Sequence, residues 1–148
     1  MKVNPVFKRL LIIWLSIFFV SLAITALYFL ITDNFFGERK DDAALLYKGL
    51  YKLVGYITVC ILAVFSLTIF FNVKPSVRYS RTSRFASFFF PYLMYLTYVI
   101  LSRFFVHEDS LKNILSYFLF SLPWLLPFAV LLIAGYVHFK KYLKNKKA

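Results

Sequence analysis

Few residues in this chain could carry out chemistry, and they are scattered along it. The two histidines, His107 and His138, fall near opposite faces of the membrane in the topology argued below, so one metal ion or one haem cannot engage both. The only outer cluster of ionisable side chains is His107-Glu108-Asp109, which is where an enzyme acting on lipids would need its acid or base. Three adjacent residues point in different directions, and a simple loop explains them equally well.

Other catalytic arrangements are absent from the sequence. Serines such as Ser116 and Ser121 have no histidine or lysine base at a similar depth, so an intramembrane hydrolase would lack its second member. The single cysteine, Cys60, allows no internal disulfide and no thiol-rich metal site. The few glycines form no phosphate-binding loop. We therefore expect no catalytic site, no metal and no cofactor, and a protein that is not an enzyme.

The composition and the apolar runs predict an all-α membrane protein in one domain, residues 1–148. Hydrophobic residues make up 61% of the chain and charged residues 16%, whereas soluble domains are about 25% charged. The chain contains four long uncharged runs, and each can cross roughly 30 Å of hydrocarbon as a helix. The four predicted transmembrane helices cover about residues 10–31, 53–71, 85–102 and 114–137. Proline lacks a backbone donor, so Pro123 and Pro127 predict a kink in the fourth helix.

The first run has a competing interpretation as a cleavable secretion signal. Lys8 and Arg9 precede an apolar stretch that contains the small-residue triplet Ser21-Leu22-Ala23. The run continues to Ile31, which favours a retained span. Cleavage would leave three spans and would not change the side on which the tail lies.

The loop charges predict that both termini are cytoplasmic. The N-terminal segment, the loop 72–84 and the tail contain no acid, whereas the other two connections contain all six acids and an equal number of bases. The net charge of +12 therefore belongs to one face, and lysine and arginine accumulate on the cytoplasmic face. We expect the bacterial cytoplasmic (inner) membrane and no nucleic-acid partner.

Two basic segments are expected to contact anionic lipid headgroups. In the loop 72–84 and in the tail, bases stand beside aromatic residues, and each base near an anionic surface is worth about 1 kcal/mol. Phe139, Tyr142 and Leu143 are expected to lie in the membrane interface. Binding to a cytoplasmic protein is the alternative. The predicted headgroup contacts are Arg78, Arg81, Arg84, Lys140, Lys141 and Lys144.

Polar and aromatic residues share one helical face in the third span, where they recur every three or four residues. Such a stripe is typical of packing against a neighbouring span, and a partner-binding face or a transport path are the alternatives. No acid falls inside a span, which argues against coupled ion transport. The stripe consists of Ser87, Pro91, Tyr95, Tyr98 and Ser102. We expect it to pack on a similar stripe in the first span, Ser21, Thr25, Tyr28 and Thr32.

The first outer connection ends in an amphipathic segment. Leu46, Leu50 and Leu53 share a face, which predicts a short helix lying at the interface before the second span. Asp41 or Asp42 would cap that helix. The segment would act as an anchor for the second span or as a surface for a partner.

The layout resembles the immunity proteins that protect bacteria from pore-forming colicins. The resemblance covers the whole chain and rests on the topology, the lysine-rich tail, and the basic stretch Arg78 to Arg84 followed by Phe88-Phe89-Phe90-Pro91-Tyr92. It implies a protein that recognises the helical hairpin of a toxin within the bilayer and stops its channel from opening. We therefore expect a non-enzymatic inner-membrane binding protein with a membrane-protein partner. The alternative is an accessory subunit of a membrane transport or envelope-assembly complex, including movement of lipid-linked sugars, and a lipid enzyme ranks third.

Overall fold

The predicted all-α fold is confirmed. The structure is a computed structural model that describes residues 4–35, 42–101 and 111–145, and these ranges contain no strand. Four of their helices are long and apolar enough to cross a membrane. The elements are α1 (Pro5–Phe35), α2 (Asp42–Phe65), the 3-10 helix η1 (Ser66–Val73), α3 (Pro75–Tyr79), α4 (Arg81–Leu101) and α5 (Leu111–Asn145).

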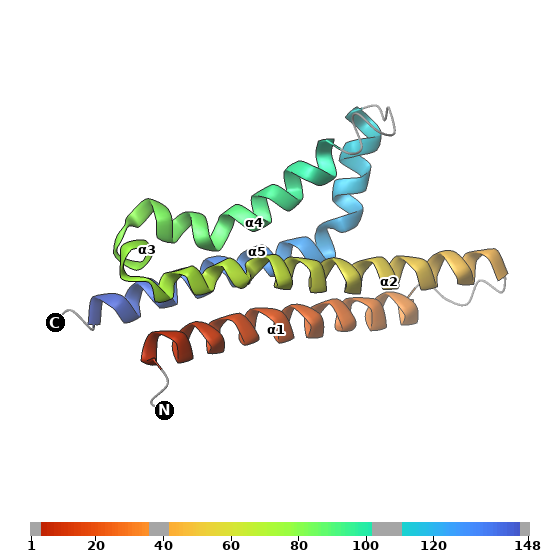
Figure 1. Ribbon diagram of the computed structural model, residues 1–148. Helices are drawn as coiled ribbons and strands as arrows, with labels where there is room; N and C mark the ends of the chain where they lie inside the picture. The colour runs from red at the N-terminus through yellow and green to blue at the C-terminus, as the bar shows by residue number, and fades with distance from the viewer. Residues whose placement is uncertain (1–3, 36–41, 102–110, 146–148) are drawn as a thin grey trace.

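The helices form a bundle from which α4 diverges. Helix α1 packs against α5, against α2 and against η1, which continues α2. Helix α4 starts close to η1 and runs away from α2 towards its C-terminal end (Figure 1). The first turns of α5 descend steeply towards the bundle, and the rest of this helix runs beside α1 and α2 (Figure 1). This bend confirms the kink predicted from Pro123 and Pro127, which both lie inside α5.

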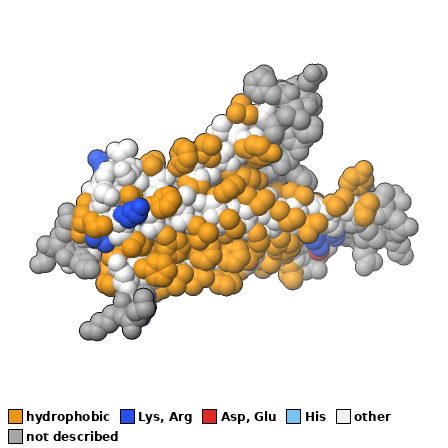
Figure 2. Space-filling view, viewed as in Figure 1, with side chains coloured by type: hydrophobic (Ala, Val, Ile, Leu, Met, Phe, Trp, Pro, Cys, Tyr) orange, Lys and Arg blue, Asp and Glu red, His pale blue; other side chains and the backbone are white. Residues whose placement is uncertain are grey.

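The exterior of the bundle is apolar, as expected for a surface that faces lipid. Large side chains such as Phe19, Leu30 and Val64 are about 60% exposed (60%, 61% and 60%). Hydrophobic side chains cover most of the visible face along the length of the bundle (Figure 2). Soluble monomers rarely expose continuous apolar patches of more than a few hundred Å². The surface therefore supports a protein that spans the membrane several times.

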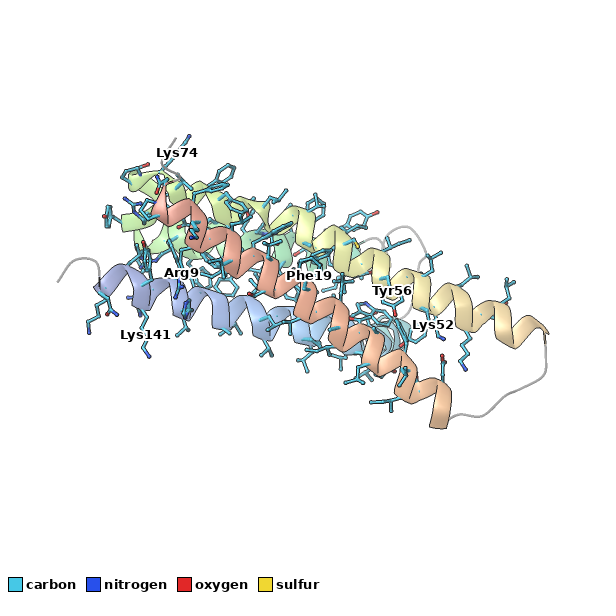
Figure 3. The ribbon with its side chains drawn as sticks, turned by 90° about the horizontal axis from the view of Figure 1, so that it is seen from below. Arg9, Phe19, Lys52, Tyr56, Lys74 and Lys141 are labelled. Carbon is cyan, nitrogen blue, oxygen red and sulfur yellow. The ribbon has the colours of Figure 1, made fainter. Side chains whose placement is uncertain are left out.

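Charged side chains gather at the two ends of the bundle. Arg9, Lys74 and Lys141 lie at one end and Lys52 lies towards the other (Figure 3). We call the first the basic end: α1 begins there, α5 ends there, and α3 lies there (Figure 1). The loop 72–84 and the tail, which are far apart in the sequence, thus meet at the same end.

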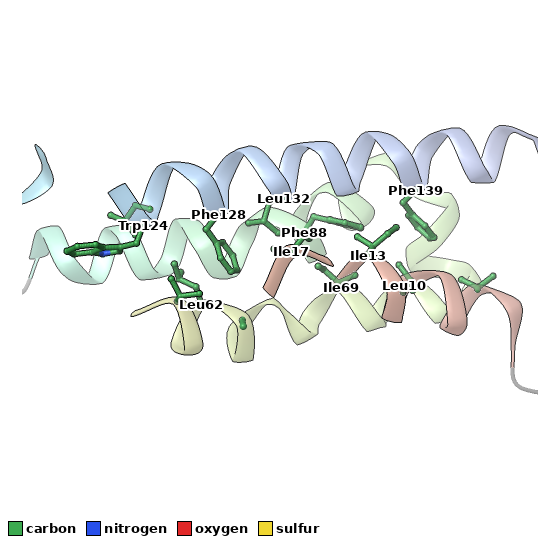
Figure 4. Packing of buried hydrophobic residues seen from close by; sticks show 14 of the residues in the cluster. Leu10, Ile13, Ile17, Leu62, Ile69, Phe88, Trp124, Phe128, Leu132 and Phe139 are labelled. Atoms are coloured by element: carbon green, nitrogen blue, oxygen red, sulfur yellow. The ribbon is translucent and has the colours of Figure 1, made fainter. Parts of the chain in front are cut away.

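Apolar residues at helical spacing hold α1 and α5 together. Leu10, Ile13 and Ile17 of α1 and Leu132 and Phe139 of α5 are all buried, and they face one another in the core (Figure 4). Ile69 of η1 and Phe88 of α4 complete the core near the basic end.

Two expectations about helix ends are wrong. The segment with Leu46 and Leu50 is not a separate interfacial helix, because α2 runs unbroken from Asp42 to Phe65 without a proline to end it. The tail does not hold Phe139 and Leu143 in the interface, because both are buried in the bundle. Their spacing of four residues extends the buried face of α5. Asp41 and the side chain of Asp42 lie outside the described residues, so the capping prediction stays untested.

The expected pairing of the two polar stripes is also wrong. Within the described residues the backbones of α1 and α4 do not come close to each other. The Thr25 hydroxyl donates to the Ser21 carbonyl at 2.9 Å, and the Thr32 hydroxyl donates to the Tyr28 carbonyl at 3.0 Å. Threonine can satisfy its hydroxyl in this way within its own helix, so it needs no partner on another span.

Candidate functional site

Hydrogen bonds fasten the start of α4 to η1. The buried Asn72 donates from Nδ2 to the Ser87 hydroxyl at 2.5 Å and to the Ile69 carbonyl at 2.9 Å. The Thr68 hydroxyl donates to the Ser87 carbonyl at 2.7 Å. Ser87, the first residue of the predicted stripe, therefore lies at a polar seam between the two helices. Inter-helix bonds of this kind hold membrane helices together where lipid offers no alternative partner.

Beyond this seam α2 and α4 separate and leave an open groove of about 560 Å³. The side contributed by α2 and η1 consists of Ile61, Phe65 and Thr68. The side contributed by α4 consists of Phe90, Pro91, Met94, Tyr95 and Tyr98. We call this the α2–α4 groove. It lies between two of the spans that are long and apolar enough to cross a membrane.

Three members of the predicted stripe line this groove. Pro91 is buried at its base, and the Tyr95 hydroxyl donates to the Thr58 hydroxyl at 3.4 Å across to α2. Tyr98 is 69% exposed. Ser102 lies outside the described residues. The stripe is thus divided, because Ser87 and Tyr95 bond to a neighbouring helix while Tyr98 lines the groove and is largely exposed.

The lining of the groove is mostly apolar. It is aliphatic and aromatic apart from hydroxyl groups, so it holds no acid, histidine or lysine that could transfer a proton. In the described part of the chain, no three His, Cys, Asp or Glu side chains gather into a possible metal site. Sequence reasoning missed the α2 side of the groove, because residues such as Ile61 and Phe65 have the pattern of any lipid-facing helix.

A second hollow lies at the basic end between α3, α4 and α5. It has a volume of about 520 Å³ and is lined by Tyr79, Arg84, Val137, Lys140, Lys141, Leu143 and Lys144. We call it the basic pocket. It brings together four of the six bases predicted to contact headgroups. Of the other two, Arg78 lies over the Tyr79 ring, with its guanidinium carbon 4.8 Å from the ring centroid, and Arg81 is exposed.

The described histidine has a structural partner next to this pocket. Arg9 of α1 donates from Nη2 to Nε2 of His138 on α5, since a guanidinium can only donate. The Arg9 guanidinium also lies 5.7 Å from the centroid of the Tyr142 ring. Both contacts join α1 to the end of α5. His107, Glu108 and Asp109, the predicted outer cluster, lie outside the described residues.

At the opposite end an acid holds two lysines. Asp33 near the end of α1 pairs with Lys48 at 2.8 Å and also with Lys52, both from α2. Lys48 and Lys52 are thus paired with a carboxylate, whereas the bases of the basic pocket have no such ion pair among the described residues.

Comparison of the chain with protein-family models, with curated proteins and with solved structures finds no match. The functional argument therefore rests on the α2–α4 groove and the basic pocket. Helix α4 contributes to both of them.

Proposed function

We propose that this protein is a non-enzymatic membrane protein that binds a transmembrane helix of another protein in the α2–α4 groove. The observation that carries the proposal is the open groove itself, which starts at the polar seam and widens along α4 within the membrane-crossing segments. Sites between the helices of a bundle are common places for binding.

The lining of the groove suits a helix. The side chains of Phe65, Phe90 and Met94 are at least half exposed, at 50%, 58% and 53%. Aromatic side chains offer large rigid contact areas, and methionine adapts its shape to irregular partners. Both types are enriched at protein interfaces. Lipid chains fill the groove when no partner is present, and a partner helix would replace them with closer packing.

The most specific version of this proposal is immunity to a pore-forming bacteriocin. In that version the groove accepts one helix of the toxin's hydrophobic hairpin and keeps the channel closed. It draws support from the topology and charge pattern shared with colicin immunity proteins, and from a groove formed by the proline-bearing aromatic span that belongs to that pattern. Recognition would take place in the bilayer through side-chain packing.

The alternative is an accessory subunit of a membrane transport or envelope-assembly complex, including one that moves lipid-linked sugars. The basic pocket favours this version, because Arg84 and the lysines of α5 suit a lipid that carries phosphate. The groove would then hold a helix of a larger subunit permanently. This version predicts a defect in the absence of any toxin.

The proposed location is the bacterial cytoplasmic membrane with both ends of the chain in the cytoplasm. Support comes from the basic end, where the acid-free segments meet, because lysine and arginine accumulate on the cytoplasmic side. A reporter fused after Lys147 should be active in the cytoplasm, and one inserted near Glu38 should be active outside. The opposite result would contradict the orientation.

The test of function is survival of sensitive bacteria that express the chain during challenge with a panel of pore-forming bacteriocins, with membrane potential as the readout. Two variants make it specific. Met94→Trp fills the groove, whereas Leu93→Trp adds the same bulk to the neighbouring position, which is equally exposed (51% against 53%) but does not line the groove.

Protection against one toxin that is lost in Met94→Trp and kept in Leu93→Trp supports the immunity version. If no toxin is resisted, a larger complex obtained by gentle detergent extraction that dissociates in Met94→Trp alone supports the accessory-subunit version. A chain that neither protects nor forms a complex sensitive to Met94→Trp contradicts the proposal.

A further inference from the structure

We propose that the basic pocket is a specific binding site for the phosphate groups of an anionic lipid headgroup. This inference is independent of the α2–α4 groove, which lies on the other side of the polar seam. It concerns a defined site, in contrast to a general attraction between a basic surface and the membrane.

Among the described residues, no acid pairs with the bases of the pocket. Arg84 of α4 and Lys140, Lys141 and Lys144 of α5 converge from two helices on the same hollow. All six acids of the chain lie in the sequence between positions 33 and 42 or at positions 108 and 109. The one whose side chain the structure describes, Asp33, pairs with Lys48 and Lys52 at the opposite end. A pocket with this much uncompensated positive charge attracts a ligand with more than one negative charge.

Arg84 is held in place, and no acid among the described residues pairs with it. Its Nη1 donates to the Arg78 carbonyl at 2.9 Å, which fixes the position of the guanidinium. Its Nε is shielded from solvent, so an anion in the pocket would have to pair with the Nη groups of this side chain. A phosphate oxygen there would accept a charge-assisted hydrogen bond. The arginine is therefore prepared for an anion before the anion binds.

The rest of the lining indicates that the phosphate belongs to a lipid. Val137 is 53% exposed and lies on α5 before the lysines, on the side of the apolar span. It continues the pocket towards the region of the acyl chains. Tyr79 of α3 lines the pocket from the neighbouring element, and tyrosine is common at the headgroup level of membranes. Free phosphate would use the bases but would gain nothing from the apolar side.

The experiment is a titration of the full-length, detergent-solubilised chain with cardiolipin, phosphatidylglycerol or phosphatidylcholine, read by native mass spectrometry. Inorganic phosphate and pyrophosphate are added in a parallel arm to separate a lipid from a soluble phosphate. We expect cardiolipin, with two phosphates, to bind more tightly than phosphatidylglycerol, and phosphatidylcholine to bind most weakly.

Arg84→Gln should weaken cardiolipin binding by about fivefold, the value of one base near anionic lipid. The matched control is Arg81→Gln on the same helix, which removes the same charge from an exposed position that does not line the pocket, and should weaken binding clearly less than Arg84→Gln does. Because Arg84 also bonds to the Arg78 carbonyl, a second variant avoids any folding defect. Lys140→Gln combined with Lys144→Gln changes two exposed lysines and should weaken binding by about 25-fold.

Three results would overturn the proposal. Equal losses in Arg84→Gln and Arg81→Gln would indicate diffuse surface electrostatics. An unchanged affinity in the double lysine variant would remove the pocket from the binding site. Inorganic phosphate or pyrophosphate binding as tightly as cardiolipin would assign the pocket to a soluble ligand and remove the lipid.

Discussion

The α1–α5 interface and the α2–α4 interface differ in how far they stay closed. Leu10, Ile13 and Ile17 meet α5 along successive turns, and a Cβ atom on Gly135 would lie only 2.8 Å from Cγ2 of Ile13. The α2–α4 interface is closed by polar bonds at Ser87 and then opens into the groove. In the most apolar part of α4 only 22% of the residues are buried, against 39% in that of the span formed by α2 and η1.

The difference shows what keeps two membrane helices in contact. Membrane helices gain no hydrophobic energy by leaving lipid for each other, so close packing and hydrogen bonds must hold them together. Gly135 allows α1 to approach α5 closely, and branched side chains fill the space around it. Along α4, bulky groups such as Phe90 and Tyr98 replace small residues beyond the seam. The closed interface builds the scaffold, and the open one leaves the groove in which we propose that a partner helix binds.

The largest predicted effect comes from filling the closed interface. Gly135→Val places methyl groups where Ile13 and Ile17 already lie, since even a Cβ would come within 2.8 Å of Ile13 and 3.2 Å of Ile17. Overpacking of this kind costs about 1–3 kcal/mol, and we expect a loss of about 2 kcal/mol in the free energy of unfolding. Reversible unfolding in SDS, followed by the fluorescence of Trp14 and Trp124, measures it.

Gly49→Val is the matched control for this change. Gly49 lies in α2, is exposed, and a Cβ built on it would meet nothing within 4 Å. Valine has a higher helix propensity than glycine, so the control should be neutral or slightly stabilising. If Gly135→Val were as stable as Gly49→Val, close packing would not be what keeps α1 and α5 together.

The sequence predicts the scaffold better than the interfaces. The spans could be predicted because a long uncharged run is stable in lipid as a helix. The kink in α5 could be predicted because proline lacks a backbone donor. The pairing of hydroxyl stripes could not be predicted, since Thr25 finds a partner in its own helix while Thr68 finds one on α4. The sequence pattern is the same whether a hydroxyl bonds within its own helix or to another helix.

The candidate sites could be predicted in part. Pro91, Tyr95 and Tyr98 of the predicted stripe line the groove, but its α2 side is apolar and has the pattern of any lipid-facing surface. The bases of the pocket were expected to contact headgroups. Arg84 lies beside the lysines of α5, and Arg81 does not. This difference depends on how α3 and α4 pack against α5, which the residue spacing does not reveal.

A smaller effect is predicted at the polar seam that limits the open interface. Asn72→Ala removes the bond to the Ser87 hydroxyl and should lower the free energy of unfolding by about 1 kcal/mol. Ser87→Ala should cost less once Asn72 is already alanine, because the shared bond is gone. A double-mutant cycle measures this coupling, for which inter-helix bonds in membranes average about 0.6 kcal/mol. Additive losses would mean that the two side chains do not hold the seam together.

The smallest effect distinguishes a hydroxyl that joins two helices from one that serves its own helix. Thr68→Val removes a bond to the Ser87 carbonyl on α4 and should cost about 0.6 kcal/mol, the average for such bonds. Thr25→Val removes a bond to a carbonyl of α1 itself, so the free energy of unfolding should hardly change. Both variants keep the shape of the side chain, and unfolding in SDS compares them directly. Equal losses would mean that bonds within a helix stabilise this bundle as much as bonds between helices, and the seam would no longer explain why the start of α4 stays packed against η1.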